Sequence, residues 1–201
     1  MGKLALKGLV LAVVIGVLGV GSYAIAGGGS KTFKGSPLNG YEENPDLSTV
    51  ATGSFEAKLS KDGTSLHYKL SYSGLEGDVQ QSHVHFGKPA INGGISFFLC
   101  SNLPNPPAGT PLCPGPRSGT VEGDIEAADV IGPGATVGPP PTAGQGIEPG
   151  NLAEILAAMR AGHAYANVHT TKWPGGEIRA QLNNRSFRHG DHDDHKKGDD
   201  H

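Results

Sequence analysis

The 201-residue chain is poor in aromatic residues, in cysteine and in net charge. Aromatic side chains make up 6% of the residues, and Cys100 and Cys113 are the two cysteines. The formal net charge is −3, so the chain lacks the strongly basic balance that is typical of nucleic-acid-binding proteins. The sequence also contains no nucleophile elbow, no glycine-rich phosphate loop and no zinc-protease helix motif. These absences argue against a nucleic-acid partner and leave no recognised catalytic motif.

Glycine and proline are abundant instead, with 32 and 15 residues, and this composition is typical of short strands joined by many turns. Residues 55–59 and 66–72 alternate between apolar and polar side chains on either side of a Lys-Asp-Gly turn, which predicts an antiparallel hairpin. Further strands are predicted within residues 80–87, 93–100, 118–132 and 163–182. We therefore expect an all-β fold: an antiparallel Greek-key β-sandwich or barrel of seven or eight short strands.

One short helix is predicted at residues 151–162. Asn151 can cap its first turn and Gly162 can end it. The apolar stripe of this helix comprises Leu152, Ile155, Leu156 and Met159. The preceding residues 132–150 are too rich in glycine and proline for regular structure, so we expect a surface loop or lid there.

The two ends of the chain differ in character from the predicted domain at residues 27–182. Residues 1–26 carry two lysines, an apolar run and a small-residue site at Ala24-Ile25-Ala26, which predicts a signal peptide and therefore export to the periplasm, the cell surface or the medium. The alternative is a retained membrane anchor, which would be the chain's only link to a membrane. Residues 183–201 lack an apolar pattern, and we expect a disordered tail.

The tail is rich in histidine and aspartate, a composition that binds transition metals loosely. Its histidines are His189, His192, His195 and His201. Two interpretations stay open, namely a segment that captures metal and a solvated polar tail.

The two cysteines lie 13 positions apart, across a loop rich in proline. In an oxidising compartment Cys100 and Cys113 are expected to form a disulfide. The alternative is a pair of thiolate metal ligands.

The sequence Ser-His-Val-His-Phe-Gly at residues 82–87 places His83 and His85 on the same face of a predicted strand. Two imidazoles at that spacing can reach one metal ion, or they can be ordinary polar residues. This strand and the segment AYANVHTTKWPGGEIRAQL at residues 164–182 together resemble the CHRD domain, the module first named from chordin. The resemblance covers residues 32–182, with Ala180 at a position where the family often has glycine. It implies an extracellular or exported β-sandwich.

Three histidines fall in the two family-like motifs: His83, His85 and His169. Imidazole suits copper and zinc, so we hypothesise a three-histidine metal site, with copper as the first choice and zinc as the second. His163 and His67 are further candidate ligands. The alternative is that these histidines bind no metal and belong to a hydrogen-bond network with Asn167, Thr170, Glu177 and Arg179.

Three functions remain open at this point. The first is an exported protein that binds a transition metal through strand histidines. The second is a non-enzymatic module that binds a protein or polysaccharide of the cell surface or matrix. The third is a redox enzyme, because the His-Val-His strand is similar to the copper-binding strand of Cu/Zn superoxide dismutase, a Greek-key sandwich.

Overall fold

The structure is a computed structural model that describes residues 30–132 and 144–182. The predicted signal peptide, most of the predicted surface loop and the histidine-rich tail lie outside the described residues. The described part contains eight strands, which are β1 Thr32–Leu38, β2 Thr52–Leu59, β3 Ser65–Ser73, β4 Val79–Phe86, β5 Gly94–Ser101, β6 Gly119–Glu126, β7 Ala164–Thr170 and β8 Ile178–Gln181. The helix α1 spans Leu152–Arg160, and two 3-10 turns lie at Gly40–Glu42 (η1) and Ala127–Asp129 (η2).

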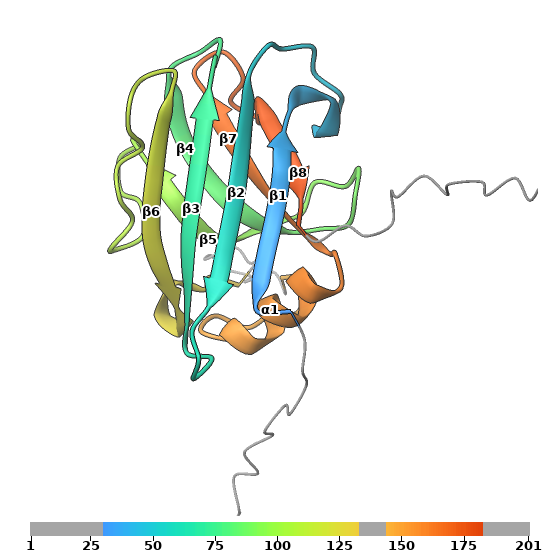
Figure 1. The fold of residues 1–201 in the computed structure, drawn as a ribbon, viewed down its shortest axis with the longest axis vertical. Helices are drawn as coiled ribbons and strands as arrows, with labels where there is room; N and C mark the ends of the chain where they lie inside the picture. Colours follow the sequence, from blue (N-terminus) through green and yellow to red (C-terminus); the bar gives the residue numbers. More distant parts are fainter. Residues whose placement is uncertain (1–29, 133–143, 183–201) are drawn as a thin grey trace, which may run out of the picture.

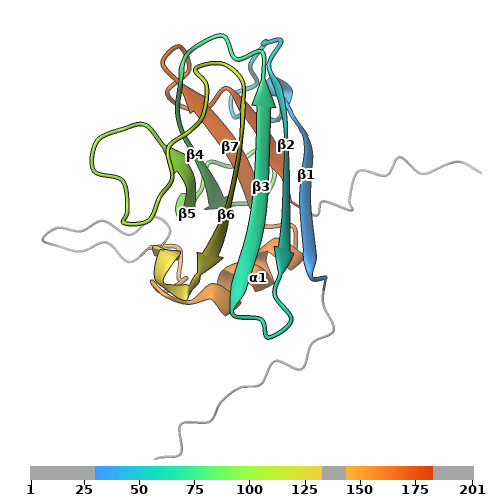
Figure 2. The same cartoon turned by 60° about the vertical axis from the view of Figure 1, so that its left-hand side comes forward.

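The strands form two antiparallel four-stranded sheets that pack face to face (Figures 1 and 2). The front sheet in Figure 1 has the order β1-β2-β3-β6, and the back sheet has the order β5-β4-β7-β8. The chain crosses to the back sheet after β3, returns to the front after β5 and crosses again after β6, which is a Greek-key connection. The predicted sandwich is therefore confirmed, and the barrel alternative is wrong because the sheets do not close on each other.

The core lies between the sheets and follows from the alternation of the strands. Phe55, Ala57 and Leu59 of β2 are buried, as the hairpin pattern predicts, and so is the alternate row of β3. From the back sheet, Val84 and Val168 belong to the same hydrophobic core. Because side chains alternate along a strand, the neighbours of Val84 and Val168 point to the opposite face of the back sheet.

Helix α1 covers the lower end of the sandwich in Figure 1. The Asn151 side chain accepts a hydrogen bond from the Glu154 amide, and Gly162 follows the last turn with a φ of +75°. The four residues of the predicted apolar stripe are all buried, so Met159 is a core residue. Among the described residues, no helix is long and apolar enough to span a membrane.

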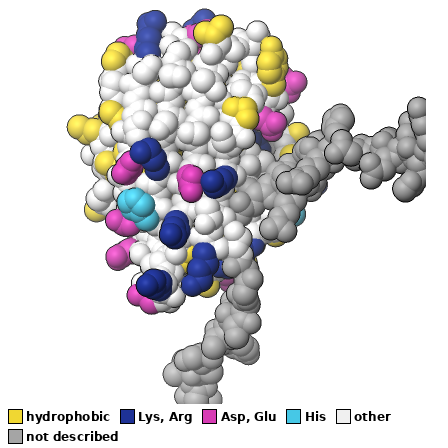
Figure 3. All heavy atoms as spheres, in the orientation of Figure 1, with side chains coloured by type: hydrophobic (Ala, Val, Ile, Leu, Met, Phe, Trp, Pro, Cys, Tyr) yellow, Lys and Arg dark blue, Asp and Glu magenta, His cyan; other side chains and the backbone are white. Residues whose placement is uncertain are grey.

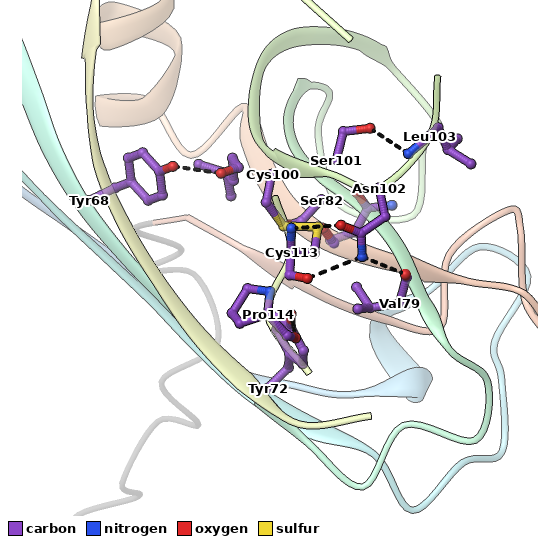
Figure 4. The surroundings of a disulfide bond; sticks show 12 residues. Tyr68, Tyr72, Val79, Ser82, Cys100, Ser101, Asn102, Leu103, Cys113 and Pro114 are labelled. Carbon is purple, nitrogen blue, oxygen red and sulfur yellow. Dashed lines mark hydrogen bonds between the residues drawn. A yellow bond between two sulfur atoms is a disulfide. The ribbon is translucent and has the colours of Figure 1, made fainter. Parts of the chain in front are cut away.

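Cys100 and Cys113 form the predicted disulfide at one edge of the sandwich (Figure 4). The Asn102 side chain holds the same loop, because its amide nitrogen donates to the carbonyl oxygens of Val79 and Cys113, and its oxygen accepts from the Cys113 amide. The Tyr68 hydroxyl donates to the Leu99 carbonyl oxygen across the two sheets. The loop is thus fixed by a covalent bond and by an amide network.

The outer face of the front sheet carries interspersed charges of both signs (Figure 3). Cross-strand ion pairs link Lys34 to Glu56 and Lys69 to Glu122. The charge pattern of this face does not single out a ligand of one sign.

Candidate metal centre

His83 and His85 of β4 and His169 of β7 lie on the outer face of the back sheet, opposite the core. The two strands are antiparallel neighbours, with His83 paired to Asn167 and Gln81 paired to His169. This register places His169 diagonally across from His83, within reach of its ring. Although they point away from the core, the three histidines are only 1%, 7% and 7% exposed.

Two loops fix two of the imidazole rings through backbone carbonyl groups. The Nδ1 atom of His85 lies 2.9 Å from the Gly93 carbonyl oxygen, in the loop between β4 and β5. The Nδ1 atom of His169 lies 2.9 Å from the Pro174 carbonyl oxygen, in the turn between β7 and β8. Because a carbonyl oxygen only accepts, each Nδ1 atom donates its proton to that oxygen. The Nε2 atom of His85, which has no partner, then presents a lone pair. Metal-binding histidines in proteins are commonly oriented in this way.

The three histidines bring ligand atoms together. One ligand nitrogen from each of His83, His85 and His169 lies within 4.8 Å of the other two. The ring centroid of His83 lies 5.3 Å from that of His85 and 4.9 Å from that of His169. Tetrahedral zinc ligands at bond lengths of about 2.0–2.1 Å stand about 3.4 Å apart, so small side-chain rotations would close this cluster around one ion.

Several buried nitrogens of the cluster have no hydrogen-bond partner. They are both ring nitrogens of His83 and the Nε2 atom of His85. Buried polar atoms normally find a partner, and an orphaned one in a native structure calls for an explanation such as an ion. The residues present therefore fit a metal ion bound through imidazole nitrogen.

The electrostatic environment keeps the three rings neutral. Burial, with smaller contributions from the other two histidines, lowers the pKa of His83 to about 2. Burial also lowers the pKa of His85 to about 4, although its hydrogen bond to Gly93 acts in the opposite direction. The pKa of His169 is lowered by burial as well. A neutral imidazole is the form that binds a metal ion.

Asn167 completes the polar part of the cluster. Its Oδ1 atom lies 3.1 Å from Nε2 of His169, so that nitrogen would have to exchange this contact for the ion in order to act as a ligand. Phe98 of β5 and Tyr165 of β7 form apolar walls, with ring centroids 4.4 Å from His83 and 4.7 Å from His85. The cluster is therefore a small polar site inside an aromatic enclosure.

The other three predicted network residues are Thr170, Glu177 and Arg179. The buried carboxylate of Glu177 accepts hydrogen bonds from the Thr49 hydroxyl, the Thr170 hydroxyl and the Glu76 amide. Among the described residues, no ion pair joins Glu177 to Arg179. Arg179 instead stacks on Tyr165. The hydrogen bonds of Thr170 and Glu177 therefore support the site without using the histidine nitrogens, whereas Asn167 contacts Nε2 of His169.

Two candidate ligands do not belong to the cluster. His163 is exposed beyond the end of α1. His67 is exposed on β3 of the other sheet and pairs with Asp124. The tail histidines lie outside the described residues.

Sequence reasoning missed Phe98 and the carbonyl groups of Gly93 and Pro174. Tyr165 falls two residues before Asn167 and four before His169, so the period of two places it on the same face. The carbonyl groups carry no residue-type signal, because every residue has one.

The profile of the CHRD domain family matches residues 35–182. No curated protein and no solved structure matches the chain. The matched range contains β2 to β8 in full, and therefore all three clustered histidines. The resemblance that was read from the two histidine motifs is confirmed over most of the chain, and we conclude that this protein belongs to the CHRD domain family.

Proposed function

We propose that this protein is an exported CHRD-domain protein that binds a transition metal, with copper as the favoured ion, through His83, His85 and His169. The observation that carries the proposal is the cluster itself, in which ligand nitrogens from two strands lie within 4.8 Å of one another. Orphaned ring nitrogens and backbone carbonyl groups that fix the ring orientation support it. When bound, the ion would supply a Lewis-acidic or redox-active centre.

Copper is favoured over zinc because of the donor set. All three side chains are neutral imidazoles, which suit both ions, and a given nitrogen site binds Cu²⁺ more strongly than Zn²⁺. Zinc remains the second ion to test.

Export is supported by the disulfide between Cys100 and Cys113. Such bonds form and persist in oxidising compartments, while thiols in the cytosol are kept reduced. The predicted signal peptide agrees with this location.

The enclosure of the histidines favours retention of a metal ion over turnover of a substrate. The ring nitrogens that would bind the ion are buried, and His83 is 1% exposed. A substrate would therefore reach the ion only after part of this enclosure moves. This is why we place metal binding ahead of an enzyme similar to superoxide dismutase.

The decisive experiment is a metal assay on a variant in which the four tail histidines are replaced by alanine, namely His189, His192, His195 and His201. We call this protein the tail-alanine variant. It is prepared without purification histidines, exposed to copper or zinc, desalted and examined by elemental analysis. We expect stoichiometric copper, which is lost in His83→Ala and in His169→Ala because each removes one of three ligands.

The matched controls are His67→Ala and His163→Ala, which remove exposed histidines outside the cluster. Both are expected to keep full metal content. Copper that is retained only when the tail histidines are present would show that the domain is not the binding site. Rapid superoxide consumption by the copper-loaded chain would instead favour the redox enzyme.

A further inference from the structure

Arg179 of β8 is a buried cation that lies one aromatic ring away from a candidate ligand. The residue is 2% exposed, and its Cζ atom lies 3.3 Å from the centre of the Tyr165 ring. The Tyr165 ring is stacked on His85, with centroids 4.7 Å apart and planes that differ by 1°. Since one face of a phenol ring cannot hold both groups at these distances, the guanidinium and the imidazole lie on opposite faces. A positive charge therefore faces the cluster through Tyr165.

The charge of Arg179 is held by neutral groups. The guanidinium donates to the side-chain oxygen of Asn92 at 3.4 Å and to the carbonyl oxygens of Lys88 and Ile91 at 3.4 Å and 3.0 Å. Within residues 30–132 and 144–182, no carboxylate forms an ion pair with Arg179. Its charge is therefore not cancelled by a direct partner.

Two acids, the buried Glu43 and the exposed Glu42, act on Arg179 through space. The Glu43 side chain is buried, its Oε1 atom has no partner, and burial raises its pKa to about 7 even though Arg179 acts to lower it. Near neutral pH the carboxyl group is therefore only partly ionised, and it compensates the guanidinium only partly.

The ligand set itself contributes no negative charge. Histidines alone make up the cluster, and no carboxylate or cysteine within the described part of the chain belongs to it. An ion bound there would keep its full charge in a buried site. The free energy cost of burying an ion rises with the square of the ion's charge. The repulsion between the ion and a nearby cation rises in proportion to the ion's charge.

We propose that Arg179 makes this site selective for a monovalent ion, so that the centre holds copper preferentially in the cuprous state. The inference rests on the copper-binding function proposed above. It assigns Arg179 a role in specificity that acts through Tyr165 and His85, without contact with the ion. Surrounding charge and burial are known means by which proteins tune the potential of a bound metal.

The test is a redox titration, at pH 8, of the tail-alanine variant loaded with copper. Cupric copper gains one electron from an added chemical reductant to become cuprous copper, and the cupric fraction is followed by electron paramagnetic resonance. In Arg179→Met, which removes the charge and keeps much of the bulk, we expect the ratio of cuprous to cupric copper at a fixed ambient potential to fall about tenfold. Arg117→Met, the same change at an exposed arginine, is the matched control and should leave the ratio unchanged.

The second variant covers the case in which Arg179→Met does not fold. Glu43→Gln removes the buried acid near Arg179 and leaves Arg179 in place, so at pH 8 it should raise the ratio of cuprous to cupric copper. An unchanged or opposite shift in a folded, copper-loaded variant overturns the inference about Arg179. Failure of the parent chain to bind copper at all would instead overturn the proposed function, so the two failures are distinguishable.

Discussion

At the scale of single residues, His83 is the member of the cluster with the least support from the protein. Neither of its ring nitrogens has a hydrogen-bond partner, and both are buried. A buried polar group without a partner costs about 1–3 kcal/mol. In the metal-free protein His83 is therefore a source of instability, which is a common property of residues that serve binding.

The pH dependence of the metal-free protein should reveal this histidine. Burial lowers the pKa of folded His83 to about 2 and of His85 to about 4, from 6.5 in the unfolded chain. The unfolded chain then binds protons that the folded chain does not, so the free energy of unfolding falls as pH drops below 6.5. Each histidine contributes a slope of up to about 1.4 kcal/mol per pH unit. Urea denaturation of the chelator-treated protein at a series of pH values measures this fall.

A comparison with His83→Leu isolates the contribution of one ring. Glu43 acts in the opposite direction, because its raised pKa gives stability that is lost as pH rises from 4.5 towards 7. Its effect is common to both proteins and cancels in the difference. The stability advantage of His83→Leu over the parent should grow steadily as pH falls below 6.5. A constant difference would mean that folding does not lower the pKa of His83.

At the scale of elements, the turn between β7 and β8 links the fold to the site. Its Pro174 carbonyl oxygen orients His169, and the base of the turn is held by Glu177 and Thr170. The Thr170 hydroxyl also accepts from the Trp173 amide, and Gly176 adopts a φ of +128° that favours glycine. The ring of His169 is therefore set by a hydrogen-bonded turn as well as by its strand.

We expect Glu177→Gln to destabilise the protein by about 1–3 kcal/mol. The new amide NH₂ would replace an oxygen that accepts from the Glu76 amide and the Thr49 hydroxyl, or one that accepts from the Thr170 hydroxyl. In the first orientation the buried NH₂ meets the NH of Glu76, and in the second the Thr170 hydroxyl proton loses its acceptor. Chemical denaturation measures the loss, and Glu122→Gln on the exposed face of β6 is the control that should change little. Equal stability of the two variants would remove Glu177 from this role.

Most elements could be predicted because their residues carry a period. The alternation in β2 and β3 and the stripe in α1 each correspond to a buried row in the structure. Strand β1 was not predicted, because Gly35, Pro37 and the small number of apolar residues obscure the alternation of apolar and polar side chains. In the turn between β7 and β8 the glycine with positive φ is Gly176.

At the scale of the whole molecule, the sequence predicted the sandwich and the three histidines but not their enclosure. Ligand type and strand period point to His83, His85 and His169. The pairing of β4 with β7 is a long-range property, and it decides that His169 joins the cluster while the exposed His163 does not. The stack of Arg179 on Tyr165 likewise depends on the pairing of β7 with β8, which no local pattern specifies.

Removal of the disulfide tests how far the sandwich depends on its covalent link. We expect the double change Cys100→Ala and Cys113→Ala to lower the free energy of unfolding by about 3 kcal/mol, because the unfolded chain gains the freedom of the opened loop. The β-sheet signal in circular dichroism should persist, since Asn102 still joins the loop to Val79 and residue 113. Urea denaturation measures the change, and complete unfolding in water would show that the core alone is insufficient.

The three histidines come from strands that are distant in the chain, and this has a consequence for the lifetime of the protein. An ion that needs both β4 and β7 in place would bind the folded chain and not the unfolded one. Each increase in the free ion concentration would then raise the free energy of unfolding. Proteases outside the cell cut mainly chains that have opened. The abundance of such a protein would then follow the supply of its ion, because the rate of proteolysis would fall as the ion concentration rises.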